Sequence, residues 1–326
     1  MKRIISFIIA ILILLVIMIG LITVFGKKNY NSISKQNDKI QIIATLFPEY
    51  DFAKHIAGDK ADVKLLLNSG VESHNYEPTA KDMITILNSD MFVFTGTELE
   101  PWTESIVNNL KQTNSKIINV SENINLIKIE DFEEKFINSE ILEDEENHKH
   151  HHDEEIYDEH IWMNPQNAII MIDNILKALC EIDKENENYY TKNAEEYKKE
   201  IIKLDNEFKS LIESASQKEI AVGGEFAYAY FVDYYDLKFV SVYKNCGEGE
   251  DPSISKVKSV IDYINKYNMP VVYYEELSEG TVAKMISEET NAEALVFYSL
   301  HNGDTSKDSY VSLMRKNLEN LEKGLK

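Results

Sequence analysis

Short apolar runs alternate with amphipathic segments along most of the chain. In the first half, strands and helices are expected in turn at residues 39–46, 49–57, 63–67, 79–88, 91–95 and 102–111. In the second half, the same alternation is expected at residues 219–222, 226–235, 239–243, 253–266, 271–274, 278–290 and 294–298, with a last helix from residue 307. Strands separated by helices of this length predict parallel sheets covered on both faces. The two blocks therefore predict an α/β fold with two lobes.

A long amphipathic helix is expected between these blocks. Residues 166–222 contain neither glycine nor proline, and apolar side chains recur at helical spacing at Tyr190, Ala194, Tyr197, Ile201, Leu204, Phe208 and Leu211. This spacing predicts one apolar face on a helix. About 25 residues at ~1.5 Å each make a rod of roughly 37 Å, long enough to lie along both lobes. The alternative is a coiled-coil dimer seam, but three heptads flanked by α/β units favour an internal rod, and we expect a monomer.

The first 28 residues are expected to form a membrane segment. Basic residues flank an uncharged run, residues 4–26, which matches the ~20 residues that cross a bilayer. The run is long for a cleaved signal and ends in a poor cleavage site. We therefore favour an uncleaved anchor over a cleaved signal, and we expect the rest of the chain on the extracytoplasmic face of the membrane. No cysteine near its end could carry a lipid. The expected order is anchor 1–28, linker 29–39, N-terminal lobe 40–187, connecting helix 188–216 and C-terminal lobe 217–326.

Composition excludes some classes of protein. With 326 residues, 44% of them hydrophobic, the chain can bury a sizeable core. The net charge of −22 argues against nucleic-acid binding, which needs a basic face. Cys180 and Cys246 could pair outside the cell, but the position of Cys180 in an apolar helical pattern favours a buried thiol.

Five of the eight histidines lie within residues 148–160. His148, His150, His151 and His152 fall in an acidic run, whereas His160 directly precedes an apolar segment. Imidazoles at this density bind transition metals, so the first functional hypothesis is metal handling. For the four loop histidines, the alternative is a solvated loop with incidental metal affinity.

Four residues at expected loop positions could share one ion. His74 follows the strand 63–67, Glu225 follows the strand 219–222 and a glycine pair, His301 follows the strand 294–298, and His160 precedes a helix that starts at Pro165. Ligands of parallel sheets gather at the carboxyl ends of the strands, so these side chains could meet between the lobes as a closed site. Any one of them could instead be an ordinary surface residue.

Four segments resemble the signature regions of a known family. They are GVESHNYEPTAKD, TGTELEPW, DEHIWMNPQNA and GGEFAYAYFVDYYDL, at residues 70–82, 95–102, 158–168 and 223–237. They are similar to regions of the metal-specific solute-binding proteins of bacterial ABC importers, the zinc and manganese receptors, and the resemblance extends from residue 40 to the C-terminus. It implies two α/β lobes joined by a rigid helix, a metal ion between them, no catalysis and delivery to a membrane permease.

Position by position, the resemblance implies His74 and His160 as the first two ligands. Glu225 stands where zinc members usually have a third histidine and manganese members have a glutamate. The family's fourth ligand, an acid, falls on Tyr298, so His301 is proposed instead, with water as the alternative. This donor set suits Zn²⁺, but also Mn²⁺ or iron. The acidic histidine-rich loop is typical of zinc members and favours Zn²⁺.

Two other functions compete with that of a receptor. In an extracellular zinc hydrolase, three of these ligands would leave an open position for an activated water. However, the sequence has no HExxH helix and no motif that places a general base. A surface adhesin or metal buffer would use the histidine-rich loop alone. The expected partners are therefore a metal ion, an ABC permease and, through the N-terminal segment, the membrane.

Overall fold

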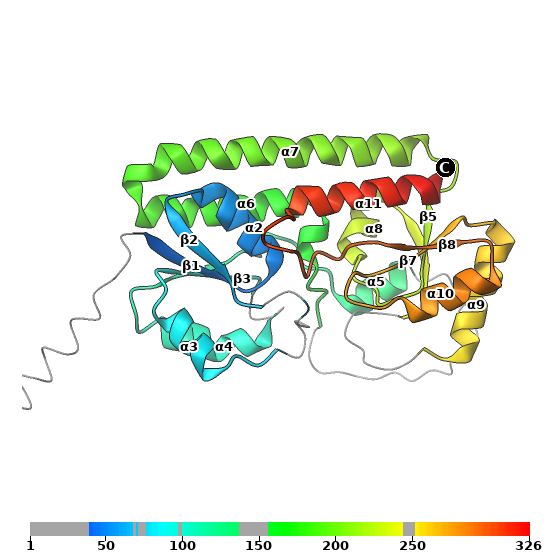
Figure 1. The fold of residues 1–326 in the computed structure, drawn as a ribbon, viewed down its shortest axis with the longest axis horizontal. Helices are drawn as coiled ribbons and strands as arrows, with labels where there is room; N and C mark the ends of the chain where they lie inside the picture. The colour runs from blue at the N-terminus through cyan, green and yellow to red at the C-terminus, as the bar shows by residue number, and fades with distance from the viewer. Residues whose placement is uncertain (1–38, 68–69, 71–75, 97–99, 137–155, 244–251) are drawn as a thin grey trace, which may run out of the picture. The chain divides into compact units, whose positions relative to one another are not determined.

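The computed structural model describes residues 39–67, 70, 76–96, 100–136, 156–243 and 252–326 (Figure 1). The first lobe is built on a parallel sheet of β1 (Ile40–Ala44), β2 (Ala61–Leu65), β3 (Met91–Phe94) and β4 (Lys116–Asn119), in the order β2-β1-β3-β4. Its helices are α2 (Phe47–Ala57), α3 (Ala80–Leu87) and α4 (Glu104–Leu110), and the short η1 (Pro101–Thr103) precedes α4. Thr79 starts α3 with a reciprocal capping box to Asp82.

The second lobe repeats this topology. Its parallel sheet has the order β6-β5-β7-β8, formed by β5 (Glu219–Val222), β6 (Lys238–Ser241), β7 (Val271–Tyr274) and β8 (Glu293–Val296). Its helices are α8 (Ala229–Tyr235), α9 (Ile254–Tyr267), α10 (Thr281–Glu289) and α11 (Tyr310–Leu325). In each sheet the first strand in sequence, β1 or β5, has the second strand on one side and the third strand on the other. Ligands of open α/β sheets bind at this point of the sheet.

The chain crosses between the lobes more than once. After β4, α5 (Ile129–Phe136) lies against the second lobe, where the Phe132 ring centroid is 5.9 Å from that of Phe226 and 5.6 Å from that of Phe239. The chain then returns through η2 (Ile161–Met163) to α6 (Pro165–Ile182). The short η3 (Lys184–Asn186) leads into the long helix α7 (Glu187–Ser214). In Figure 1, α6 lies under one half of α7 and α11 under the other.

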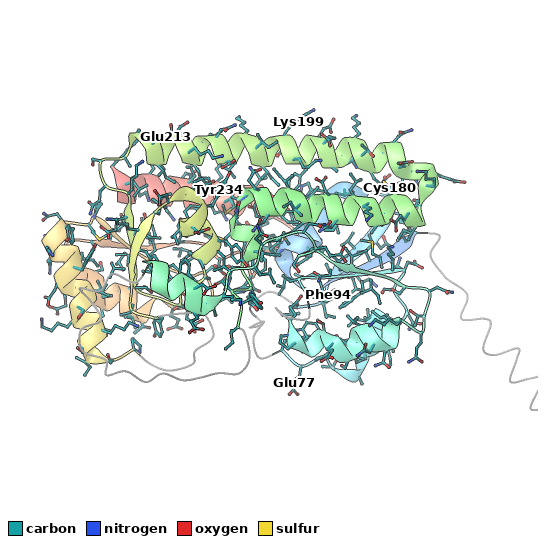
Figure 2. The ribbon with its side chains drawn as sticks, turned by 180° about the vertical axis from the view of Figure 1, so that it is seen from behind. Glu77, Phe94, Cys180, Lys199, Glu213 and Tyr234 are labelled. Carbon is teal, nitrogen blue, oxygen red and sulfur yellow. The ribbon has the colours of Figure 1, made fainter. Side chains whose placement is uncertain are left out.

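The expected rod is α7, with 28 residues and a length of about 42 Å at ~1.5 Å per residue. Its apolar face is buried inside the chain as predicted, except that Leu211 is half-buried and Ile212 is buried. The opposite face is exposed, and Lys199 and Glu213 project from it in Figure 2.

Two buried aspartates fix α7 to the lobes. Asp51 on α2 accepts hydrogen bonds from the Tyr197 hydroxyl and, at 3.0 Å, from the backbone N–H of Tyr310, and its other oxygen lies 3.2 Å from His55 Nδ1. Asp205 on α7 accepts from the hydroxyl of Tyr235 on α8 at 3.1 Å. A carboxylate removed from water needs such donors, so these networks hold the rod to both lobes.

One hydrophobic core runs through both lobes and the helices that join them. A second, smaller core lies between the second sheet and α9 and α10, with Val260, Val272 and Ile286 as members. Because most core side chains belong to one continuous cluster, the lobes are not independent bodies joined by a flexible linker.

The prediction of two parallel-sheet lobes and a long connecting helix is confirmed. β2 begins two residues before the expected strand, and β4 and α5 were not expected. Cys180, expected to be buried, is half-buried on α6, and Cys246 lies outside the described residues. Within the described part of the chain, no helix combines the length and apolarity needed to cross a bilayer. The segment predicted as an anchor lies outside that part.

Candidate metal site

Three side chains with metal-binding atoms meet between the lobes. One ligand atom each from Glu159, His160 and His301 lies within 4.8 Å of the other two. The three residues are 8%, 1% and 5% exposed. Two imidazoles and a carboxylate match the donors that zinc and related divalent ions use. The structure therefore brings together two of the four predicted ligands and adds one that was not predicted.

His160 lies in the first wall of the site, which is the turn of residues 158–163 that leads into α6. Its backbone N–H and its ring Nδ1 both contact one carboxylate oxygen of Asp158, at 2.9 and 3.0 Å. Because a carboxylate only accepts, Nδ1 carries the hydrogen and Nε2 is the atom with a lone pair for a metal ion. Asp158 is itself held at its backbone by Ile127 and Tyr230.

His301 lies in the second wall, the turn of residues 298–303 after β8. Leu300, buried just before it, has a φ of 67°, a left-handed conformation that costs a non-glycine residue ~1–2 kcal/mol. Ser299 holds this turn in place. Its backbone N–H donates to Glu276 at 2.6 Å, and its carbonyl accepts from Trp162 Nε1 at 2.8 Å. The second contact joins the two walls directly.

The two walls also meet at the ligand atoms. His301 Nε2 lies 2.8 Å from Glu159 Oε1, and both side chains are buried. The rings of His160 and His301 have centroids 4.5 Å apart at 61°, and Trp162 packs edge-on against both. Since the rings are packed on several sides, the histidines have little room to turn away from each other.

Glu225 lies beside this cluster but is not one of its three members. It follows β5 and the Gly223–Gly224 pair, and it lines a pocket of about 450 Å³ together with His301 and Glu275. Gly224 is required for close approach, because a Cβ there would lie 2.2 Å from a carboxylate oxygen of Glu275. Burial, followed by the charge of Glu225, raises the pKa of Glu275 to about 7.

Tyr298 packs against α11. Its backbone N–H and carbonyl pair with the Asn317 side chain at 2.6 and 2.8 Å, and its ring lies 5.1 Å from the ammonium group of Lys316. Of the two residues considered for the fourth ligand, His301 is the one that belongs to the cluster with Glu159 and His160. His74 and the loop histidines His148, His150, His151 and His152 lie outside the described residues.

Two further carboxyl groups are buried in the first lobe. Glu49 accepts from the Thr95 hydroxyl at 2.5 Å, and Glu100 accepts from the Thr95 backbone N–H at 2.6 Å. Burial raises the pKa of Glu49 to about 7, with a smaller contribution from the charge of Glu159. Burial and the neighbouring Glu49 hold the pKa of Glu100 well above its usual range. The charge of Glu159 in the first wall thus disfavours ionisation of both carboxyl groups.

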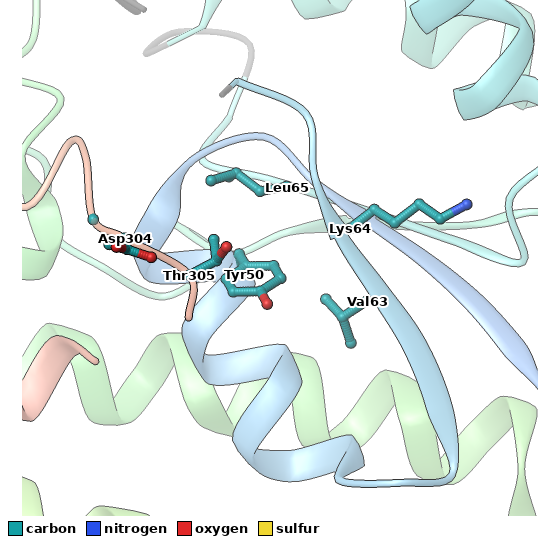
Figure 3. Close-up of a pocket in the computed structure, with 7 residues that line it drawn as sticks. Tyr50, Val63, Lys64, Leu65, Asp304 and Thr305 are labelled. Atoms are coloured by element: carbon teal, nitrogen blue, oxygen red, sulfur yellow. The ribbon is translucent and has the colours of Figure 1, made fainter. Parts of the chain in front are cut away.

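A larger pocket lies elsewhere, between β2 and the turn of residues 303–305 (Figure 3). It has a volume of about 710 Å³ and is lined by Tyr50, Lys64 and Asp304, among others. The Asp304 carboxylate already accepts from Ser306 and Lys307 at 2.6 and 2.7 Å. With one committed carboxylate and a lysine, this pocket has no donor set for a metal ion.

Asp158 and Glu159 are the site residues that sequence reasoning missed. Both belong to DEHIWMNPQNA, but only His160 was selected from that motif. The available signal was an acidic pair directly before a candidate ligand. The sequence does not show that the two acids differ in role. Asp158 contacts His160 in its own turn, whereas Glu159 contacts His301 across the site.

Comparison with known proteins adds a family. The model of the family described as zinc-uptake complex component A, periplasmic, matches residues 42–324. The high-affinity zinc uptake system protein ZnuA of Bacillus subtilis is 29% identical over 298 residues, which is 90% of each chain. The zinc-binding lipoprotein AdcA of Streptococcus pneumoniae is 30% identical over 88% of this chain, which spans only 56% of that relative's length.

Solved structures agree with this comparison. The zinc-bound ZnuA-like domain of Streptococcus pneumoniae AdcA superposes with a TM-score of 0.71 at 26% identity, covering 88% of this chain and 99% of the domain. A manganese-bound mutant of a periplasmic metal-binding protein from Candidatus Liberibacter asiaticus gives a TM-score of 0.71 at 25% identity, covering 88% and 100%. Both zinc-bound and manganese-bound proteins therefore share this fold.

Proposed function

The chain belongs to the family of zinc-uptake complex component A, and on this premise we propose that it is an extracytoplasmic receptor that captures zinc for an ABC importer. The observation that carries the proposal is the buried group of Glu159, His160 and His301 between the lobes. The permease that would receive the ion is the partner implied by relatives named as uptake proteins. The N-terminal segment is proposed to hold the receptor at the membrane, and the receptor is proposed to act as a monomer.

The proposed ligands are His74, His160, Glu225 and His301. The position of Asp158 supports His160, because a carboxylate on Nδ1 fixes the ring and makes Nε2 a better ligand. The pocket that Glu225 shares with His301 supports a carboxylate from β5. His74 follows β2, and the backbone of Gly70 in the same connection donates to Asn302 beside His301 at 2.6 Å. Gly70, four residues before His74 in sequence, thus lies beside the second wall.

Manganese is the second candidate. A carboxylate at Glu225 suits manganese as well as zinc, and a manganese-bound protein shares the fold. Zinc is favoured by the two buried imidazoles and by the names of the relatives compared above. Hydrolysis has no such support, because the family is one of uptake components.

The decisive experiment measures metal content and binding. Protein purified without added metal should contain zinc, and the stripped protein should bind one zinc ion tightly. His160→Ala or His301→Ala should each weaken this binding by orders of magnitude, because each removes one of about four bonds to the ion. His55→Ala is the matched control, since His55 lies on α2 outside the cluster. Unchanged affinity in both site variants would reject the proposed function, and purified protein that carries manganese would replace zinc as the cargo.

The histidine-rich loop is proposed to collect ions weakly before they reach the site. Its sequence is highly polar, and a polar tract that becomes ordered only on binding has a lower affinity than a preformed site because of the cost of ordering. Deletion of residues 147–155 should therefore remove additional weak zinc binding and leave the tight site intact, as titration calorimetry would measure. Loss of the tight site in this deletion would mean that the loop itself supplies a ligand.

A further inference from the structure

Glu159 has no assigned role in the ligand set above, yet it makes one of the two 2.8 Å contacts between the two walls. Its carboxylate Oε1 lies 2.8 Å from His301 Nε2. His301 Nδ1 points in another direction, toward the Ser299 hydroxyl at 3.3 Å. Nε2 is therefore the His301 atom that faces the other ligands, and Glu159 occupies the place beside it.

The backbone on both sides of Glu159 is fixed. The Asp158 N–H donates to the carbonyl of Ile127 at 2.9 Å, and the His160 N–H donates to Asp158. The carbonyl of Glu159 accepts from Ile161 at 2.8 Å. With the backbone held in this way and the side chain 8% exposed, the carboxylate has little freedom to leave the site when an ion enters.

The distances leave room for an ion after a small movement. In a tetrahedral zinc site with bonds of about 2.0–2.1 Å, two ligand atoms are about 3.4 Å apart. Glu159 Oε1 and His301 Nε2 are closer than this, while all three ligand atoms of the cluster lie within 4.8 Å of one another. Separation of Oε1 and Nε2 by about half an ångström would thus admit an ion between them, in place of the hydrogen they share.

From this geometry we propose that Glu159 is a direct ligand of the captured ion and that it also joins the two walls before the ion arrives. The inference rests on the proposed metal-receptor function and adds a second carboxylate to its ligand set. Without the ion, the Glu159–His301 hydrogen bond holds the walls close to their ligand-bound spacing. When the ion binds, it takes the place of that hydrogen, which leaves as a proton to solvent, while a hydrogen stays on Nδ1 toward the Ser299 hydroxyl. Glu159 then binds as a carboxylate and His301 as a neutral imidazole through Nε2.

A second carboxylate also affects metal preference. Imidazole nitrogens suit zinc, whereas carboxylate oxygens and higher coordination numbers suit manganese. With Glu159 and Glu225 both bound, the site would contain two carboxylates and could hold five ligands. Removal of the Glu159 charge should therefore weaken manganese binding more than zinc binding.

The test uses Glu159→Gln, which keeps an oxygen that can accept from His301 but removes the anionic ligand. The matched control is Glu219→Gln, because Glu219 is also a buried carboxylate but accepts from the Tyr263 hydroxyl at the start of β5 and is not a member of the ligand cluster. Zinc and manganese affinities are measured by competition with a chromogenic chelator. The visible absorption of the cobalt(II)-loaded protein reports the number and type of ligands.

Glu159→Gln is expected to lose at least about tenfold in zinc affinity, more in manganese affinity, and to change the cobalt spectrum, while Glu219→Gln keeps the wild-type spectrum. A wild-type spectrum in Glu159→Gln would overturn the proposal, because Glu159 would then be only a hydrogen-bond partner of His301. Tighter zinc binding would overturn it as well, since Glu159 would be a competitor of the ion.

Two further measurements separate other failures. If Glu159→Gln does not fold, Glu159→Asp is tested instead. It keeps the charge with a shorter reach, and an altered cobalt spectrum supports the proposal whereas an unaltered one rejects it. If wild-type protein binds zinc through His160 and His301 but Glu159→Gln behaves like wild type, only the role of Glu159 is wrong. If wild-type protein does not bind zinc or manganese, the proposed function itself is wrong.

Discussion

The two histidines of the candidate site are held in different ways. In the first wall, His160 is fixed by Asp158 two residues away, through contacts of 2.9 and 3.0 Å to one carboxylate oxygen. In the second wall, Ser299 is also two residues from His301 but makes only a 3.3 Å contact to Nδ1, and the shortest contact of the ring is the interlobe one to Glu159 at 2.8 Å. The shortest ring contact of His160 is therefore local, whereas that of His301 crosses between the lobes.

This difference indicates which wall responds to the ion. A ring held by its own turn keeps its ligand atom in place whether or not the ion is bound. His301 exchanges one partner for another when the ion binds, so the turn of residues 298–303 should change its hydrogen bonds. The continuous core and the anchored α7 leave little capacity for wide lobe closure. The response should accordingly be local, in the second wall.

Among the variants that test this difference between the walls, Asp158→Asn should have the largest effect on zinc affinity. An asparagine keeps an oxygen for the His160 backbone but binds Nδ1–H less strongly, so zinc affinity should fall by about 10- to 100-fold. Chelator competition measures the change, and a thermal scan verifies that the variant is folded. Asp173→Asn is the control, because Asp173 is exposed on α6 and pairs with Lys198. An affinity equal to wild type would mean that His160 does not need its local support.

Glu49→Gln should raise the stability of the folded protein at neutral and higher pH. The pKa of Glu49 is raised from 4.5 to about 7, so between these values the folded state binds more protons than the unfolded state. Its contribution to stability therefore falls as pH increases from 4.5 to 7, and the full cost remains above pH 7. Glu49→Gln, which removes the charge, should raise the free energy of unfolding by about 2 kcal/mol at pH 8 and change it little at pH 4.

Urea unfolding at the two pH values measures this difference. Glu213→Gln is the control, because Glu213 is exposed near the end of α7 (Figure 2). An equal change at both pH values would mean that Glu49 affects stability through packing and not through its protonation.

The sequence predicted the lobes and the rod because both arise from repeated patterns. Alternating strands and helices define the sheets, and an apolar side chain every three or four residues defines α7. β4 was missed because KIIN has only two apolar residues, Ile117 and Ile118, between polar ones. The helix α5 was missed because its packing against the second lobe depends on contacts between distant residues such as Phe132 and Phe239. Local patterns do not encode such contacts.

The site was predictable to a similar extent. His160 and His301 follow from their positions at the ends of expected elements. Glu159 does not, because three acidic or histidine residues in a row give no information on which side chain points across the crevice. Its contact with His301, 142 positions away, is determined by the turn that pins Asp158 and by the left-handed residue Leu300.

Ser299→Ala should produce the smallest effect and tests the second wall. The Ser299 hydroxyl lies 3.3 Å from His301 Nδ1 and 3.1 Å from Glu276, so its removal takes one long contact from each. Zinc affinity should fall by less than about tenfold, below the loss in Asp158→Asn, since a 3.3 Å contact is weaker than one at 3.0 Å. Ser306→Ala is the control, because Ser306 is exposed and bonds to Asp304. A loss in Ser299→Ala as large as that in Asp158→Asn would mean that both histidines depend equally on hydrogen bonds to Nδ1. The Glu159 contact would then not be what positions His301.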